Sequence, residues 1–181
     1  YSGNGSTQEI NQSGNSTFQP SLGWIKERNG TRVHSLYDEP RGVQKYLQVN
    51  EADAESTSSL SLTSFDTDGF TLGSGPGVNN SGNTYVGWQW LAGGAGSSNE
   101  DGSINTTATS VNTAAGISIS TYSGNGVTGA TVGHGLGVKP AVVIIKPRNA
   151  ADNWIVSDPS GDFVNKLKLN ETEAASSATH P

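Results

Sequence analysis

The sequence repeats itself after about 120 residues, and this repetition restricts the folds that the chain can adopt. The pentapeptide YSGNG stands at residues 1–5 and returns at residues 122–126. The segment PSLGWIKERN at 20–29 likewise returns as PAVVIIKPRN at 140–149, with Pro, Ile, Lys, Arg and Asn in step. Because each copy of a tandem repeat builds the same supersecondary unit, we expect one structural unit to occur twice.

The second copy matches only the first part of the first copy. The segment KLKLNE at 166–171 corresponds to KYLQVNE at 45–51, and no later residues correspond to 65–90. We therefore expect that the parent polypeptide continues or that another chain completes the half-repeat. The expected domains are a first β-sandwich repeat at 1–95, a polar linker or long loop at 96–115, and the start of a second repeat at 116–181.

Short alternating segments separated by turn residues predict an all-β protein. The chain has 24 glycines and abundant Ser, Thr and Asn, a composition that disfavours helices, and only residues 50–56 could form a single helical turn. Turn signals recur roughly every 8 to 12 residues, which is typical of an antiparallel β-sandwich or jelly roll. The expected strands are 22–26, 33–37, 45–50, 60–65, 70–72, 84–91, 116–122, 141–146, 153–157 and 163–169.

The charge, the apolar runs and the missing cysteines exclude several classes of protein. A net charge of −6 opposes binding to nucleic acid, whose phosphates would be repelled. The longest apolar run, AVVII at 141–145, is far shorter than the roughly 20 residues of a membrane-spanning helix, so we expect no membrane insertion. Without cysteine the chain can form neither disulfides nor cysteine-ligated zinc sites.

The acidic residues are candidates for metal binding or catalysis, but they lie in turns. Asp66 and Asp68 precede Gly69 as at the start of many calcium loops, so they are weak Ca²⁺ candidates. No later Glu completes an EF-hand, and we interpret the segment as an acidic turn that needs no cofactor. Asp38 and Arg41 flank a proline, and we expect an Asp/Arg turn at the surface, echoed by DPSG at 158–161.

Neither the histidines nor the glycine-rich segments form a recognisable catalytic or nucleotide-binding motif. His34, His134 and His180 are isolated and lack metal-binding or triad spacing. The segments GSGPGV at 73–78 and GHGLGV at 133–138 are not followed by a helix that could hold phosphate, so we interpret them as turns. We therefore assign no catalytic residue.

The strand TYVGWQWL at 84–91 has two faces of different character. Val86, Trp88 and Trp90 share one face, and we expect this face to be core because tryptophan buries a large apolar area; a sugar-stacking platform is the alternative. Tyr85 lies on the other face of the strand. The candidates for contact with a glycan are this tyrosine and the asparagines of the preceding loop, namely Asn79, Asn80, Asn83 and Tyr85.

Several longer motifs occur in an order that resembles a known repeat. They are YSGNGSTQ, FQPSLGWIKERNG, HSLYDEPRGVQKYL, LTSFDTDGFTLGS, NNSGNTYVGWQWLAGG and ATVGHGLGVKPAVVIIKPRN. In this order they resemble a repeat found in tail-fibre and other virion proteins of marine bacteriophages, and the resemblance covers nearly the whole chain. It implies a concanavalin-like or laminin-G-like jelly roll and carries no enzyme activity.

The resemblance implies a place in the virion, an extracellular particle. We expect a structural module of a tail fibre, tail spike or capsid-attached fibre that binds a bacterial surface glycan or protein as host receptor. The alternatives are a purely architectural capsid decoration or connector protein and, less favoured, a glycan depolymerase. The expected partners are other virion proteins and further copies of the chain, with a homotrimer favoured by analogy with the family.

Overall fold

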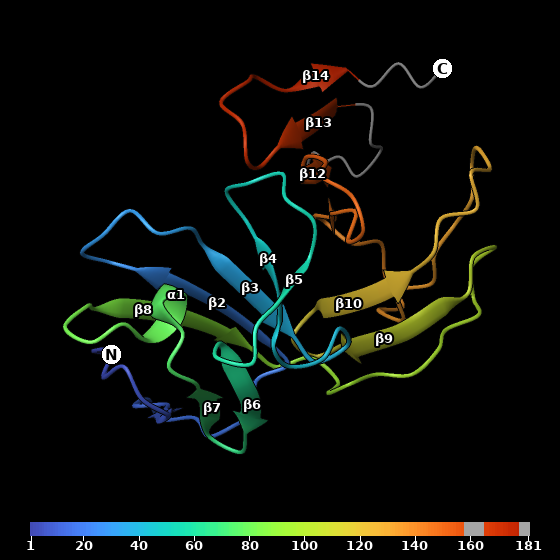
Figure 1. The fold of residues 1–181 in the computed structure, drawn as a ribbon. Coiled ribbons are helices and arrows are strands. Elements are labelled where there is room, and N and C mark those ends of the chain that lie inside the picture. Colours follow the sequence, from blue (N-terminus) through green and yellow to red (C-terminus); the bar gives the residue numbers. More distant parts are fainter. Residues whose placement is uncertain (158–164, 178–181) are drawn as a thin grey trace.

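The chain folds almost entirely into antiparallel β-structure, which confirms the expected fold class. The computed structural model describes residues 1–157 and 165–177 and arranges their strands in four sheets (Figure 1). The largest sheet has the strand order β5-β4-β3-β2-β8. Its strands are β2 (Leu22–Glu27), β3 (Ser35–Asp38), β4 (Lys45–Gln48), β5 (Ser56–Thr57) and β8 (Tyr85–Trp90).

A smaller sheet packs on one face of the five-stranded sheet and forms a sandwich with it. Its order is β1-β7-β6, from β1 (Gln8–Asn11), β6 (Leu62–Asp66) and β7 (Gly69–Leu72). The core contains Ile25 and Tyr37 from the large sheet and Leu62, Phe70 and Leu72 from the small one, all at most 1% exposed. The alternation of the sequence explains this core, because every second side chain of a strand points to the same face.

One helical turn occurs among the described residues, but not where we expected it. The turn is α1 (Pro76–Asn79), whereas residues 50–56 contain no helix. Proline suits this position because its fixed φ matches the first turn of a helix and its missing N–H needs no partner there. Within the described part of the chain, no helix is long and apolar enough to cross a membrane.

The segment 96–115, expected as a linker or long loop, instead contains a strand. Strand β9 (Thr106–Asn112) pairs with β10 (Ile117–Tyr122) in an antiparallel hairpin. The expectation was wrong because the buried residues of β9 are polar, namely Thr106, Thr109 and Ser110. The Thr109 hydroxyl lies 2.8 Å from that of Thr106 and 3.0 Å from that of Ser120, so these buried groups satisfy one another's hydrogen bonds.

The second large sheet is a meander of four strands in the order β11-β12-β13-β14. The strands are β11 (Ile144–Ile145), β12 (Ile155–Ser157), β13 (Asn165–Lys168) and β14 (Ser176–Ser177), and they lie at the top of Figure 1. The expected strands at 141–146 and 153–157 are therefore present but shorter. The first two residues of the expected strand 163–169, the DPSG turn at 158–161 and His180 lie outside the described residues.

The register of this second sheet matches that of β2 to β5 at a constant offset of 120 residues. Trp24 pairs with Leu36 as Ile144 pairs with Val156, and Lys45 pairs with Thr57 as Asn165 pairs with Ser177. A loop contact follows the same rule: the His34 N–H donates to Asn50 Oδ1 at 2.8 Å, and the Trp154 N–H donates to Asn170 Oδ1 at 2.8 Å. We call residues related in this way offset equivalents.

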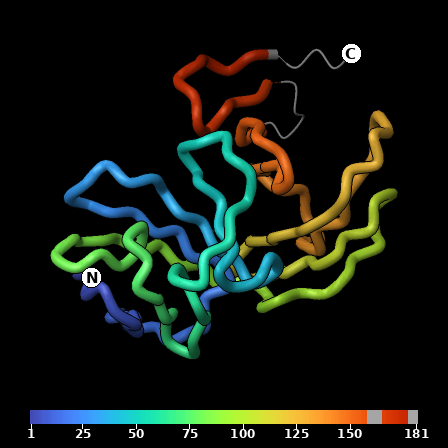
Figure 2. The backbone as a smooth tube through the Cα atoms, in the orientation of Figure 1, coloured from blue at the N-terminus to red at the C-terminus, as the bar shows by residue number. Residues whose placement is uncertain are grey.

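The hairpin loop between β11 and β12 rests on the loop between β4 and β5, as the backbone path in Figure 2 illustrates. The Glu55 N–H donates to the Arg148 carbonyl and the Asp152 N–H to the Ala52 carbonyl, both at 2.8 Å. Trp154, which is 4% exposed, packs in one apolar cluster with Leu47 and Val49. Its indole Nε1–H donates to the Gln48 carbonyl at 3.0 Å.

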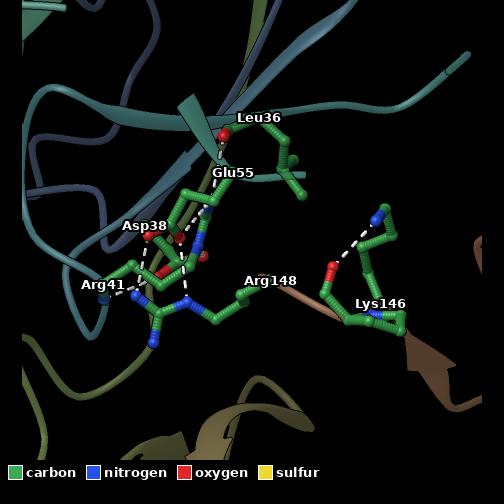
Figure 3. A network of polar contacts seen from close by, with 7 residues as sticks. Leu36, Asp38, Arg41, Glu55, Lys146 and Arg148 are labelled. Carbon is green, nitrogen blue, oxygen red and sulfur yellow. Dashed lines mark hydrogen bonds and ion pairs between the residues drawn. The ribbon is translucent and has the colours of Figure 1, made fainter. Parts of the chain in front are cut away.

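A buried ion network strengthens this contact (Figure 3). Arg41 donates to Asp38 at 2.6 Å and to Glu55 at 3.3 Å, and Arg148 donates twice to Glu55, at 2.9 and 2.8 Å. Asp38 and Arg41 are only 4% and 6% exposed, so the expected surface turn is wrong. The charges of the turn can be buried because Asp38 pairs with Arg41 and Arg41 also contacts Glu55, which in turn is paired with Arg148.

Candidate functional site

The outer face of the five-stranded sheet carries three tryptophans, and we call Trp24, Trp88 and Trp90 the aromatic face. Trp88 and Trp90 are 45% and 38% exposed. The Trp24 and Trp88 rings meet edge to face at an interplanar angle of 65°, with centroids 5.8 Å apart. Such an edge-to-face contact fixes the orientation of the two rings, so an incoming ligand meets a preformed apolar surface.

Strand pairing brings these tryptophans together. In the register of β2 with β8, Trp24 lies opposite Trp88 and Leu22 lies opposite Trp90. Side chains directly opposite each other in an antiparallel pair point to the same face of the sheet. The aromatic face therefore follows from two sequence segments that are about 60 residues apart.

The expectation that Trp88 and Trp90 form the core is wrong, because the opposite face of β8 is the packed one. A side-chain carbon at Gly87 would lie 3.3 Å from the Phe70 ring, and one at Gly23 would lie 3.7 Å from Phe65. Phenylalanines of the small sheet thus pack directly on the backbone of the large sheet. The glycine within the strand YVGWQW was the sequence signal that we misread, since it marks a close approach.

Two of the predicted contact residues are buried, and their expected exposure is wrong. Tyr85 is 1% exposed, and its ring stacks on Tyr1 with centroids 5.1 Å apart. Asn79 is fully buried, and its amide nitrogen donates to the carbonyls of Ser6 at 2.5 Å and Gly73 at 2.9 Å. Both side chains hold the N-terminal segment against the sandwich, so neither offers a surface to a glycan.

The other two predicted contact residues are half-buried and hold loop conformations. The Asn80 backbone N–H donates to the Tyr85 hydroxyl at 2.9 Å. The Asn83 amide donates to the Glu27 carboxylate, which is 5% exposed. The four predicted residues thus lie near one another at the start of β8, but they are not part of the aromatic face.

His34 borders the aromatic face and is held in one tautomer. The Trp24 indole Nε1–H donates to His34 Nδ1 at 2.9 Å, so this nitrogen carries no proton and Nε2 carries it when the ring is neutral. Burial and the nearby Lys26 charge lower the pKa of His34, which favours the neutral ring. A neutral imidazole with a free Nε2–H can donate to an acceptor at the rim of the aromatic face.

A cleft runs along the other side of β8, between it and β1. It has a volume of about 490 Å³ and is lined by aromatic and amide side chains, among them Tyr1, Gln12 and Gln89. Gln12 donates to the Phe18 carbonyl at 3.0 Å and lies 3.4 Å from Gln89 Oε1. Strand β8 therefore contributes to two surfaces, a stacking surface and a polar cleft, and the sequence had indicated only its aromatic residues.

The weak calcium candidates lie in the tight turn of a hairpin. Asp66 and Gly69 pair across the turn between β6 and β7, and the Thr71 hydroxyl donates to Asp66 Oδ2 at 2.7 Å. Asp68 Oδ1 is buried without a hydrogen-bond partner. Within residues 1–157 and 165–177, no group of three or more His, Cys, Asp or Glu side chains could hold a metal ion. The two carboxylates alone would give a calcium ion too few ligands.

A family model described as a domain of unknown function, DUF7483, matches residues 1–180. The chain belongs to the DUF7483 family. No curated protein and no solved structure matches this DUF7483 chain. We therefore argue the function from three features of the chain itself, namely the aromatic face, the cleft beside β8 and the ion network.

Proposed function

We propose that this DUF7483 protein is a structural module of a bacteriophage virion that binds a bacterial surface glycan through the aromatic face. The observation that carries the proposal is the exposure of Trp88 and Trp90 on a rigid sheet. Exposed apolar patches of this kind mark interaction sites, because leaving large aromatic rings in water is unfavourable. Sugar rings present flat C–H faces that pack on indole rings, and their hydroxyls suit the polar groups beside the platform.

The motifs shared with phage virion proteins support the viral part of the proposal. Such proteins present many copies of a module, so weak contacts add up and each platform needs only modest affinity. An open platform with two or three rings fits this requirement. Partners would then be other virion proteins and a host receptor, with the protein located in the extracellular particle.

Adsorption of the purified protein to bacterial cells tests the proposal. We expect Trp88→Ala and Trp90→Ala to weaken adsorption at least about tenfold, which corresponds to about 1.4 kcal/mol. Periodate oxidation of the cell-surface glycans, which cleaves the vicinal diols of the sugar rings, should abolish it. Tyr122→Ala is the matched control, because Tyr122 is 39% exposed but lies on the hairpin β9–β10. Unchanged adsorption by both tryptophan variants would contradict a role for the aromatic face.

A purely architectural role is the second candidate, and the exposed apolar side chains of the second sheet favour it. Ile144, Leu167 and Leu169 are 52%, 42% and 42% exposed. A capsid decoration or connector protein would cover such residues with a neighbour. Stoichiometric binding to purified capsids, without binding to cells, would favour this role over glycan recognition.

We do not extend the proposal to glycan hydrolysis. A glycosidase needs two carboxyl groups separated by roughly 5 to 10 Å across a substrate cleft. Asp38 is held by Arg41 in a buried ion pair, and Asp66 accepts a hydrogen bond within its hairpin turn. These carboxylates already have structural roles.

A further inference from the structure

The second sheet exposes a continuous apolar strip on its outer face. Ile144, Val156 and Leu167 lie side by side on β11, β12 and β13, and Leu169 lies two residues beyond Leu167. We call these four residues the apolar stripe. Leu167 and Leu169 are each 42% exposed, whereas their offset equivalents, Leu47 and Val49, are each 4% exposed.

The difference in exposure has a visible cause. Leu47 and Val49 are covered by Trp154, which the hairpin loop between β11 and β12 delivers to them. Among the described residues, no corresponding aromatic side chain packs in a buried cluster with Leu167 and Leu169. The apolar stripe therefore has the composition of a covered face and the exposure of an uncovered one.

The main-chain groups of the same contact also have unused equivalents. The Glu55 N–H and the Ala52 carbonyl bind the hairpin loop within the chain, and their offset equivalents are the Ala175 N–H and the Thr172 carbonyl. Both residues are exposed, and neither group has a hydrogen bond among the described residues. The loop between β13 and β14 thus offers the same pair of main-chain groups, one N–H and one carbonyl, as the loop between β4 and β5.

A segment that could bind these main-chain groups and the apolar stripe is present in the chain itself. Residues 28–34, which connect β2 and β3, are the offset equivalent of residues 148–154, which connect β11 and β12. Arg28 is the equivalent of Arg148 and is exposed. His34 is the equivalent of Trp154, and its Nε2–H, left free by the bond from Trp24 to Nδ1, can replace the indole N–H as the donor.

The charges of the two loops are complementary. Residues 28–34 carry Arg28 and Arg32; Arg32 has a side chain that is 47% exposed and lies 3.8 Å from the Glu27 carboxylate. The loop between β13 and β14 carries Glu171 and Glu173; Glu173 has a side chain that is 66% exposed and pairs with Lys168 at 2.8 Å. Opposite charges on two surfaces that must meet favour encounter and fix their register.

We infer that copies of this chain associate head to tail, with residues 28–34 of one copy docked on the apolar stripe of the next copy and on its loop between β13 and β14. The contact uses between chains the apolar and main-chain parts of the contact that residues 148–154 make within the chain. The ion pair of Arg148 with Glu55 has no direct counterpart, because Ala175 stands at the offset position of Glu55. Because its two sides are different surfaces, it is heterologous, and it builds a closed ring or an open row according to the rotation between copies. This inference does not depend on glycan binding or on a viral origin.

Analytical ultracentrifugation of the full chain tests the inference. We expect the average mass to rise with protein concentration, and the association to weaken with salt because charged loops take part. Leu167→Asp should leave a monomer at concentrations where the unchanged protein associates. Val127→Asp is the matched control, because Val127 is 63% exposed and lies away from the proposed contact, and this variant should associate normally.

A mixing experiment identifies the two sides of the contact. Leu167→Asp removes the receiving side, and the double variant Arg28→Glu, Arg32→Glu removes the inserting side. Each variant alone should remain monomeric, with an unchanged far-ultraviolet circular dichroism spectrum as the check of folding. An equimolar mixture should form dimers and nothing larger, because only one intact contact is possible in each pair.

Three outcomes would overturn the inference. The first is a chain that stays monomeric at every concentration. The second is an equal loss of association in Val127→Asp and Leu167→Asp. The third is a mixture of the two monomeric variants that forms no dimer, which would show that the loop and the stripe do not bind each other.

Discussion

Replacement of Trp154 by alanine is the most direct test of the contact between the two large sheets. A tryptophan side chain buries roughly 150–250 Å², which at about 25 cal/mol per Å² corresponds to about 4–6 kcal/mol. Trp154 is 4% exposed, so nearly all of this area counts, and substitutions of buried tryptophan typically cost about 3–5 kcal/mol. The Gln48 carbonyl also loses its indole donor. We expect Trp154→Ala to lower the free energy of unfolding by about 4 kcal/mol.

Trp88→Ala provides the comparison, since it makes the same chemical change at an exposed position. Trp88 is 45% exposed and keeps about half of its area in contact with neighbours, so we expect a cost of about 2 kcal/mol or less. Guanidinium unfolding followed by far-ultraviolet circular dichroism measures both values without relying on tryptophan fluorescence. Equal costs for the two variants, or a larger cost for Trp88→Ala, would refute the assignment of core and surface made here.

Three further substitutions test the ion network, the N-terminal anchor and the approach of β1. Burial raises the pKa of Glu55, but Arg148 and Arg41 outweigh this effect and hold it below its ordinary value of about 4.3. The stabilisation by the ionised Glu55 carboxylate is therefore present above about pH 4.3 and is lost as the pH falls through the lower pKa of the folded state. Glu55→Gln should reduce the free energy of unfolding at pH 7 and make that free energy decline less steeply in acid. Unfolding at several pH values measures both effects. Asn79→Ala should cost about 2–3 kcal/mol in thermal unfolding, because buried groups of the N-terminal segment lose their partners. Gly69→Ala should cost roughly 2 kcal/mol or more, because the φ of Gly69 is +141° and a side-chain carbon there would meet the Ile10 carbonyl. Amide exchange in β1 should become faster in this variant. Gly14→Ala is the control and should be nearly neutral, because a side-chain carbon at Gly14 would lie in open space.

The positions of most strands were predictable because short alternating segments and turn residues report local structure. The faces of a strand were harder to assign. Alternation in 84–91 separated Trp88 from Tyr85 correctly, but it could not show which face another sheet covers. That information resides in Phe70, a residue of a different sheet, and only Gly87 hinted at it from within the strand.

Contacts that depend on distant residues were not predictable from local patterns. Asp38 and Arg41 were interpreted as a surface turn because the network that covers them runs through Glu55, which Arg41 contacts, to Arg148, a residue 93 positions after Glu55. Strand β9 was missed for a different reason, since its buried residues are Thr106, Thr109 and Ser110, and polar residues give no apolar alternation in the sequence. The sequence therefore indicated the tryptophans of the candidate site but not their exposure. It did not indicate the cleft or the apolar stripe.

The hairpin of β9 and β10 links the sandwich to the second sheet, and the buried hydroxyl groups of β9 affect how this link responds to force. Thr106, Thr109 and Ser110 are at most 7% exposed, yet they contribute little apolar area to resist the entry of water. Each hydroxyl can also exchange its role as donor for that of acceptor, so water molecules can replace these bonds one at a time. Under tension along the chain we expect this joint to yield first, while the sandwich on one side and the meander on the other stay folded.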